Sequence, residues 1–337
     1  MAGAPCPACG EPLGEGFAFC DACGVELAVA ARTAAGAVPS TVDGDGTAPV
    51  GSLGRWVAAP GPPDEATCTG CGGTAFGVEG YCDTCGQRRP AGPDHSELDL
   101  PGVAVVTDKG KRHKHNEDAA GLAALPGVRA AVVCDGVSSS SRPEAASHAA
   151  VDAAVPALVS ALRGGGDAGT ALRTAARAAQ AAATLAGGAS PGGNPPSSTF
   201  VAAVAHADTV TVAWIGDSRA YWLPVPAGPP AAPATCLTVD DASPGGLLRW
   251  LGADARDTEP HLRTFTPAGP GLVLVCSDGL FRYRPDPVEL AALATAEVPD
   301  PAAAPLALAQ ALVRFALDQG GQDNVTAAVL PFPPQEP

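Results

Sequence analysis

Four aspartates in this sequence each stand at the boundary of an apolar segment. Three follow such a segment, in AAVVCDG, VAWIGDS and LVLVCSDG, and one precedes it, in GGQDNVTAAV; they are Asp135, Asp217, Asp278 and Asp323. A carboxylate at the end of a buried strand is costly unless a cation meets it. We therefore expect one shared cation site, and hard oxygen ligands of this kind favour Mg²⁺ or Mn²⁺ over zinc.

Each of these acid-Gly or acid-Asn pairs is also compatible with an ordinary turn. All four share one apolar pattern, which favours a common site over four unrelated turns. Asp135, Asp278 and Asp323 could bridge or flank two cations, with the carbonyl of Gly136 as an extra ligand. Two divalent cations about 4 Å apart clamp a phosphate and ionise a shared water. Such a water attacks phosphorus directly, so this chemistry requires no serine or cysteine nucleophile.

The basic segment KGKRHKH contains every lysine of the chain, namely Lys109, Lys111 and Lys114. The formal net charge of the whole chain is −15. A single positive segment in such an acidic protein would attract phosphorylated peptides if it lay beside the cation site. The alternative is a solvated loop without a ligand. For His148 and His206, packing or solvation is a more economical interpretation than ligation.

Eight of the eleven cysteines form two repeated CxxC…CxxC sets with ten residues between the pairs of each set. The sets are Cys6, Cys9, Cys20 and Cys23, followed by Cys68, Cys71, Cys82 and Cys85. Four thiolates at this spacing predict a closed structural zinc site in each set, hence two zinc ions. The competing interpretation is a redox dithiol or disulfide pair. The single cysteines Cys134, Cys236 and Cys276 lie in or beside apolar strands and are expected to behave as small core residues.

Composition divides the chain into four parts. Residues 1–30 and 66–90 are the two expected zinc ribbons, because units this short need a metal in order to fold. Residues 31–65, rich in Ala, Gly, Pro, Asp and Thr, have the composition of a flexible linker. Residues 98–334 are the expected main domain.

The main domain has a mixed pattern of strands and helices. Apolar runs predict strands at 102–107, 128–134, 199–206, 209–216, 219–223, 235–239, 272–276 and 325–330. Helices are predicted near 143–163, 167–187, 287–296 and 304–319. Because strands and helices arrive in blocks rather than in strict alternation, we expect an α+β fold with antiparallel sheets.

The acidic balance argues against a general binder of nucleic acid or of anionic membranes. No apolar stretch is expected to span a bilayer. The segment MAGAPCPACGEP lacks the charged and apolar regions of a secretory signal. We therefore expect a cytoplasmic protein of 337 residues, in a compartment where thiols stay reduced.

From Gly102 to Phe332 the chain resembles the metal-dependent protein Ser/Thr phosphatases of type 2C, in their bacterial form. The resemblance rests on segments in the same order, namely TDKG…HNEDA, VVCDG, SSTFVAAV, WIGDSRAYW, LTVDDASP, LLRWLGAD, LVLVCSDGLF and GGQDNVTAAV. It implies a four-layer sandwich, in which two antiparallel β-sheets lie face to face and are flanked by helices. Here two small zinc ribbons precede the sandwich.

The resemblance also implies a role for each acid. Asp135 would bridge two Mn²⁺ or Mg²⁺ ions, Gly136 would give its carbonyl to one, and Asp278 and Asp323 would hold the other. Asp217 would join Asp278 at a third, looser metal. The resemblance further places Glu117 and Asp118 around the metals, where they would orient bound waters.

Three departures from the family pattern concern substrate recognition. The family usually has an arginine five residues before Asp118, forked onto the substrate phosphate. Here that position is His113, and the candidates for binding phosphate are His113, Arg112 and Lys114. Alternation along an extended strand makes His113 the direct replacement, and it would need a proton to hold phosphate well. His113 is also a candidate general acid, with water as the alternative. In addition, Ser138 and Ser139 replace the usual glycines, and the segment between LTVDDASP and LLRWLGAD is shorter than the usual flap.

The leading hypothesis is a phosphatase that hydrolyses phosphoserine and phosphothreonine in proteins. Its substrates would be phosphoproteins made by bacterial kinases of the eukaryotic type. The alternative is a pseudophosphatase that binds phosphoproteins as a regulator or scaffold through its zinc ribbons. A third hypothesis, a zinc-ribbon nucleic-acid factor, predicts salt-dependent binding by residues 1–90.

Overall fold

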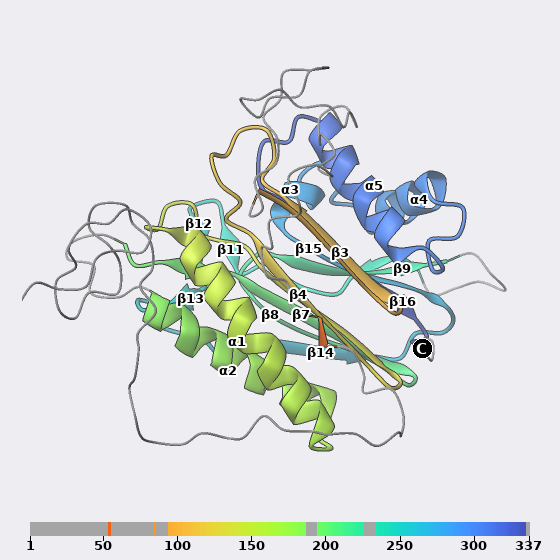
Figure 1. Ribbon diagram of the computed structural model, residues 1–337, viewed down its shortest axis with the longest axis horizontal. Coiled ribbons are helices and arrows are strands. Elements are labelled where there is room, and N and C mark those ends of the chain that lie inside the picture. The colour runs from red at the N-terminus through yellow and green to blue at the C-terminus, as the bar shows by residue number, and fades with distance from the viewer. Residues whose placement is uncertain (1–52, 55–83, 85–93, 187–193, 226–232, 335–337) are drawn as a thin grey trace, which may run out of the picture. The chain divides into compact units, whose positions relative to one another are not determined.

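Two six-stranded antiparallel sheets lie face to face in the part of the chain that the computed structural model describes, which is residues 53–54, 84, 94–186, 194–225 and 233–334 (Figure 1). Side chains from both sheets meet in one apolar layer that includes Leu122, Val201, Trp222 and Val273. The main body belongs to a compact unit that runs from Val50 to Pro337. The eight cysteines of the two predicted zinc sites lie outside the described residues.

The first sheet contains the two strands that come before Asp135 and Asp217 in the chain. Its strands are, in spatial order, β1 (Leu53–Gly54), β4 (Ala119–Leu125), β5 (Val128–Cys134), β7 (Phe200–His206), β8 (Thr209–Ile215) and β14 (His261–Phe265). All seven residues of β4 and of β5 are buried, because one face of these strands meets the second sheet and the other meets helices. Each strand of this sheet pairs antiparallel with its neighbour.

The second sheet contains the other two strands that lead to the site. Its order is β10 (Thr235–Cys236), β9 (Arg219–Pro224), β15 (Gly271–Cys276), β16 (Val325–Phe332), β3 (Val103–Asp108) and β2 (His95–Leu100). β15 and β16 are buried along their whole length. Their antiparallel register pairs Cys276 with Ala327, so the end of β15 lies beside the start of β16.

Helices cover the outer face of each sheet (Figure 1). On the first sheet, α1 (Pro143–Arg163) and α2 (Ala168–Ala186) pack through alanines and leucines at helical spacing. On the second sheet, α4 (Pro287–Glu297) and α5 (Pro305–Asp318) do the same, and α3 (Asp278–Phe281) is a single turn after β15. The result is the helix–sheet–sheet–helix arrangement that the sequence predicted, so the expected α+β sandwich is confirmed.

The helix α1 corrects one expectation, because by length and composition alone it could cross a membrane. A single helix of this kind is weak evidence for a membrane span, since core helices pass the same test. In the described structure α1 packs against α2 and the first sheet, with Ala150, Ala154 and Leu158 buried.

Several elements differ from the sequence prediction. The strands β2, β4 and β14 were not predicted, and the expected strand at 235–239 is only two residues long. The segment AAGLAAL of β4 has none of the β-branched and aromatic residues that favour strands, so its burial between two layers decides its conformation. Leu53–Gly54, inside the predicted linker, pair with β4, and β2 begins at His95, before the predicted domain start at 98.

The short connection near the expected flap is a small hairpin. β11 (Ala242–Ser243) pairs with β12 (Gly246–Leu247), and β13 (Leu251–Gly252) then pairs with β6 (Ser197–Ser198). Arg249 anchors this connection, since its guanidinium contacts Asp241 and Asp257. Its Nη1 also lies 2.6 Å from Nε2 of His261 in β14, which ties the connection to the first sheet.

Candidate metal centre

Five carboxylates meet at one end of the two sheets, and we call them the acid cluster: Asp118, Asp135, Asp217, Asp278 and Asp323. Asp135 directly follows β5 and Asp217 follows β8 in the first sheet, whereas Asp278 follows β15 and Asp323 precedes β16 in the second. Asp118 directly precedes β4. The other four members of the cluster all repel the Asp135 carboxylate and raise its pKa. Residues from distant parts of the chain therefore converge, as their positions at strand ends predicted.

Burial and repulsion from other carboxylates make the ionised forms of Asp118, Asp135, Asp217 and Asp278 unfavourable without a cation. Burial raises the pKa of Asp135 well above its ordinary value, and the neighbouring carboxylates raise it further. Burial, followed by repulsion from Asp323, raises the pKa of Asp278 to about 7, although Arg282 opposes this. Burial also raises the pKa of Asp217. A group of carboxylates in this state gains strongly from a divalent cation.

Asp118 is held by a directed chain of hydrogen bonds. Its Oδ2 accepts hydrogen bonds from the hydroxyls of Ser277 and Thr326, both at 2.7 Å. Thr326 lies 2.6 Å from the hydroxyl of Thr107, which in turn accepts from the amide of Asn116 at 2.9 Å.

The other oxygen of Asp118, Oδ1, is buried and receives no hydrogen bond from the described residues. Burial raises the pKa of Asp118 to about 6. A buried oxygen without a partner is costly. Oδ1 therefore has an unused lone pair that could accept a hydrogen bond from a water held by a metal.

The segment between β3 and β4, residues 109–118, is a loop, so the strand alternation that selected His113 does not apply there. Asn324 fastens this loop, because its amide nitrogen donates to the carbonyls of Lys109 and His115 at 2.8 and 3.0 Å. Its amide oxygen accepts from the backbone N–H of Glu117 at 2.9 Å. Asn324 follows Asp323 directly, so the same turn positions an acid and the loop that faces it.

Glu117 and Gly136 form the side of the site next to α1. The hydroxyl of Ser138 donates to Oε2 of Glu117 at 2.6 Å, so the serine that replaces a family glycine fixes this carboxylate. The N–H of Gly136 donates to the carbonyl of Glu117 at 3.1 Å. A Cβ at position 136 would lie 2.7 Å from that carbonyl oxygen and 2.8 Å from Pro143, which explains the requirement for glycine.

Two basic side chains pair with the acids of the second sheet. His113 Nε2 lies 3.0 Å from Oδ1 of Asp323, and its Nδ1 lies 3.7 Å from Glu117. Arg282 contacts both Asp278 and Asp323, the latter at 2.8 Å between Nη1 and Oδ2. In the described part of the chain no lysine, arginine or histidine forms an ion pair with Asp135 or Asp217. Among the described residues, basic side chains therefore pair with Asp278 and Asp323 but not with Asp135 or Asp217.

The donor set is compatible with a hard divalent cation. It consists of carboxylate oxygens and the nearby backbone of Gly136, which suit Mg²⁺ and Mn²⁺. In the present arrangement, however, no three His, Cys, Asp or Glu side chains among the described residues enclose a common metal position. The pairing of Asp278 and Asp323 with Arg282 and His113 gives a physical reason for this, since these cations stand against the same oxygens.

The remaining basic residues and cysteine singled out in the sequence differ in their exposure. Arg112 and Lys114 are exposed on the loop 109–118, and His206 is exposed. Burial lowers the pKa of His148 on α1, in agreement with the expected packing role. Cys134 is fully buried next to Asp135, and burial raises the pKa of its thiol, so it is unsuited to act as a nucleophile.

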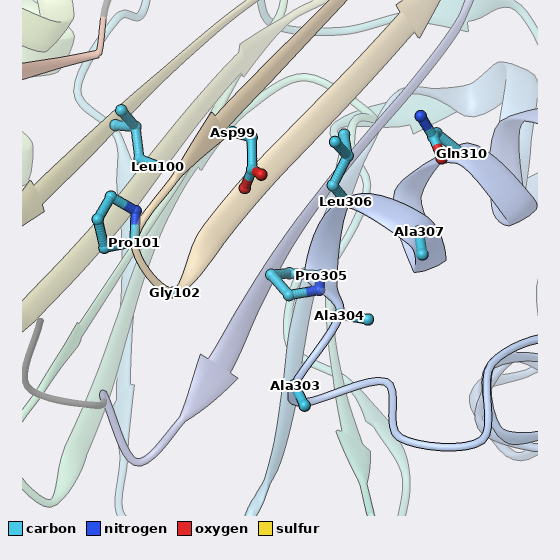
Figure 2. A pocket seen from close by; sticks show the side chains of 10 residues that line it. All are labelled: Asp99, Leu100, Pro101, Gly102, Ala303, Ala304, Pro305, Leu306, Ala307 and Gln310. Atoms are coloured by element: carbon cyan, nitrogen blue, oxygen red, sulfur yellow. The ribbon is translucent and has the colours of Figure 1, made fainter.

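A separate cavity of about 630 Å³ lies at the far end of β3 from the acid cluster (Figure 2). The β2–β3 turn at Pro101 and Gly102 lines one side, and the start of α5 at Pro305 and Leu306 lines the other. Asp99 and Gln310 supply its polar side chains. None of the residues predicted to bind metal or phosphate lines this cavity, so it is not part of the candidate metal centre.

Sequence reasoning missed the residues that support the acids. Ser277, Thr326 and Asn324 adjoin the predicted aspartates in SDG and DNVT, and this adjacency was the available signal. Thr107 and Asn116 belong to the quoted segments TDKG and HNEDA. Arg282 carried no signal of its own, because its role depends on the single turn of α3 that brings it to Asp278.

Two family models match the chain. The model of protein phosphatase 2C matches residues 107–312, and the model of the double zinc ribbon matches residues 6–86. No curated protein sequence matches the chain.

Solved bacterial phosphatase structures have the same fold. The serine/threonine phosphatase Stp1 from Staphylococcus aureus is 23% identical, with a TM-score of 0.53, and the match covers 70% of this chain and 97% of that one. A bacterial serine phosphatase is 20% identical, with a TM-score of 0.52 and coverage of 70% and 98%. The serine/threonine phosphatase of S. agalactiae is 18% identical, with a TM-score of 0.50 and coverage of 69% and 98%.

The identities to these solved structures establish the fold alone, whereas the match of the phosphatase model spans more than half of the chain. The chain belongs to the protein phosphatase 2C family and carries a double zinc ribbon in its N-terminal part.

Proposed function

We propose that this protein hydrolyses phosphoserine and phosphothreonine esters in proteins with the help of two Mn²⁺ or Mg²⁺ ions. The observation that carries the proposal is the convergence of the acid cluster from strand ends of both sheets. Asp135, Gly136, Asp278 and Asp323 would hold the two ions, and Asp217 would join Asp278 at a third. Membership of the phosphatase family supports the reaction class.

Bound divalent ions would neutralise the phosphate and lower the pKa of an attacking water. The protein supplies the geometry for this chemistry. Asp118 is fixed through Ser277 and Thr326, which leaves its buried Oδ1 as a free hydrogen-bond acceptor. Glu117, held by Ser138, supplies a second acceptor. These two carboxylates would orient the attacking water without themselves bonding to phosphorus.

Substrate phosphate would meet the basic loop 109–118. His113 lies within reach of Asp323 and Glu117, so its side chain faces the acids, as the family position of the phosphate arginine requires. Arg112 and Lys114 are exposed on either side of it and would contact the phosphate or the peptide around it. We propose that a protonated His113 binds the phosphate and also serves as the acid for the leaving hydroxyl.

The natural substrates in this proposal are phosphoproteins, since an exposed basic loop suits an extended phosphorylated segment better than a deep apolar pocket does. Phosphoproteins made by bacterial kinases of the eukaryotic type fit this chemistry. A cytoplasmic location would place the enzyme beside such kinases.

The test is Mn²⁺-dependent hydrolysis of p-nitrophenyl phosphate and of a phosphothreonine peptide by the full chain. We expect turnover that requires Mn²⁺ and that falls by about 10³-fold in Asp278→Asn, because the substitution removes a charge that holds the ions. Asp208→Asn, at an exposed turn between β7 and β8, is the matched control and should keep full activity. Binding of the phosphopeptide without turnover would instead establish the pseudophosphatase.

A further inference from the structure

Asp278 and Asp323 are already engaged by a basic side chain of the same chain. Arg282 follows the single turn α3, four residues after Asp278, and its two terminal nitrogens contact different carboxylates. One nitrogen contacts Asp278 and the other lies 2.8 Å from Oδ2 of Asp323. The guanidinium therefore bridges the two acids that the proposed function assigns to one metal ion.

Both oxygens of Asp323 have partners within the protein. Oδ2 receives Arg282, whereas Oδ1 lies 3.0 Å from His113 Nε2 and accepts from the backbone N–H of Asn324 at 3.0 Å. An ionised carboxylate has about four lone-pair sites, so these three partners use most of them, and a divalent ion at Oδ2 also meets the positive charge of the guanidinium. By contrast, Asp135 and Asp217 have no ion pair with any described residue.

Arg282 is well placed to leave, because its side chain is 60% exposed whereas that of Asp278 is only 11% exposed. Water can solvate the guanidinium once it leaves, while the carboxylates stay behind and require a new cation. An exposed ion pair is weak enough for a divalent ion to replace it. The arrangement thus combines a fixed anionic site with a removable cation.

We propose that Arg282 is an internal counter-ion that occupies Asp278 and Asp323 in the metal-free protein and must be displaced before a divalent ion binds there. This inference rests on the proposed metal site. It assigns unequal affinities to the two ions: binding on the side of Asp135 meets no competing ion pair, whereas binding at Asp278 and Asp323 is weakened by Arg282.

The test is a calorimetric titration of the full chain with Mn²⁺, comparing wild type with Arg282→Gln. We expect the weaker binding step to tighten by about three- to tenfold in the variant, as for loss of an exposed competing ion pair. The stronger step should stay unchanged. Arg282→Lys, which keeps one charge but cannot bridge both acids, should lie between the two.

Arg284→Gln is the matched control. Arg284 lies two residues away and pairs with Glu289 at 3.0 Å rather than with the acid cluster, so its removal changes the net charge equally. Its Mn²⁺ affinity should equal that of wild type after correction for long-range charge, which high salt suppresses.

Thermal unfolding gives a second readout that is independent of the calorimetric titration. In the metal-free state Arg282→Gln leaves the acids without their counter-ion, so its Tm should lie below that of wild type, and Mn²⁺ should raise its Tm by a larger amount. Unchanged or weaker Mn²⁺ binding by Arg282→Gln would overturn the inference while leaving the proposed function intact. If wild type and all variants bind no Mn²⁺, the proposed function fails together with the inference.

Discussion

At the scale of one residue, the fold holds the Asp118 carboxylate in one orientation and leaves one of its oxygens free. One of its oxygens is saturated by two hydroxyl donors and the other is buried without a partner. The hydroxyls come from Ser277 and Thr326, at the end of one strand and the start of its neighbour in the second sheet. Two hydrogen bonds thus fix the carboxylate and leave one oxygen as a free acceptor, which is the arrangement expected of a group that positions water.

Removal of one donor tests this orientation. In Thr326→Val the Asp118 carboxylate loses a 2.7 Å hydrogen bond, and the hydroxyl of Thr107 loses its 2.6 Å partner, at nearly constant side-chain volume. We expect the free energy of unfolding at pH 7.5 to fall by about 1.5–3 kcal/mol, the range for hydrogen bonds to charged groups. Urea denaturation measures this value.

The control is Thr211→Val, which removes a neutral hydroxyl pair with Thr264 at 3.0 Å, in the first sheet. Its expected cost is only about 1 kcal/mol. Equal losses in the two variants would show that the charge of Asp118 is not involved.

The predicted acids Asp135, Asp278 and Asp323 lie where the sequence placed them, because an acid after an apolar run marks a strand end that can be recognised locally. The supporting contacts depend on which strand ends become neighbours. The bridge from Arg282 to Asp323 spans 41 positions in the chain, and no local pattern specifies it. Prediction therefore reached the ligand candidates but not their partners.

At the scale of elements, the loop 109–118 is positioned by the turn before β16. Asn324 contributes three hydrogen bonds to this loop, and Gly279 lets α3 approach the same turn. A Cβ on Gly279 would lie 1.9 Å from the carbonyl oxygen of Asn324. The loop, α3 and β16 therefore form one packed unit around Asp323.

Loss of this anchor should release the loop. In Asn324→Ala we expect the backbone amides of residues 109–118 to exchange with deuterium at least about tenfold faster, while those of β5 keep their protection. Hydrogen-exchange mass spectrometry measures both. Asn194→Ala, which removes a hydrogen bond to Ser139 in a different loop, should leave residues 109–118 unaffected. Equal exchange of this loop in Asn324→Ala and wild type would contradict the assigned role.

The helices were predicted closely and several strands were not, for a physical reason. The ends of α1 follow from Pro143 at its start and the glycines after Arg163, which are local signals. The strand β4, by contrast, is Ala-rich, and its pairing with β5 determines its conformation. Alanine favours helices when packing does not decide, so this strand could be recognised only in its tertiary context.

His95 on the edge strand β2 forms a hydrogen bond with Asp108 on β3, at 2.8 Å. Burial by itself would lower the pKa of His95, but hydrogen bonds with Asp108 and Glu97 outweigh it and raise the pKa to about 9. A histidine whose pKa is raised on folding contributes stability that is complete below its unfolded value near 6.5 and is lost as pH rises through about 9.

We therefore expect His95→Gln to lower Tm most below about pH 6.5, with the difference from wild type disappearing above about pH 9. Thermal unfolding from pH 5.5 to 9.5 measures the difference. Gln310→Ala, which removes an uncharged partner of Glu97 at 2.8 Å, should shift Tm by an amount that does not vary across this range. A His95→Gln difference that is independent of pH would refute the raised pKa.

At the scale of the whole molecule, the chain joins a phosphatase sandwich to a double zinc ribbon. The order of quoted segments predicted the sandwich, because each segment occupies one position in a fold with fixed topology. The cysteine spacing predicted the ribbons, since four thiolates at this spacing suit one tetrahedral ion. Neither pattern specifies how the ribbons act on the phosphatase part.

The metal content of the full chain tests the ribbon prediction. We expect two zinc ions per chain by mass spectrometry of metals, falling to one in Cys85→Ser, because each set of four cysteines binds one ion. Cys236→Ser, at a half-buried position of the sandwich, should retain both ions. Absence of zinc together with oxidised cysteine pairs would favour the redox interpretation.

The most direct test of the central claim, that the acid cluster holds divalent ions, is an anomalous-scattering map from crystals of the protein grown with Mn²⁺. The account predicts manganese peaks bonded to Asp135 and to Asp278 or Asp323, with Arg282 turned away from these acids. Well-occupied manganese elsewhere on the protein, with the acid cluster still paired to Arg282 and His113 at saturating Mn²⁺, would contradict it.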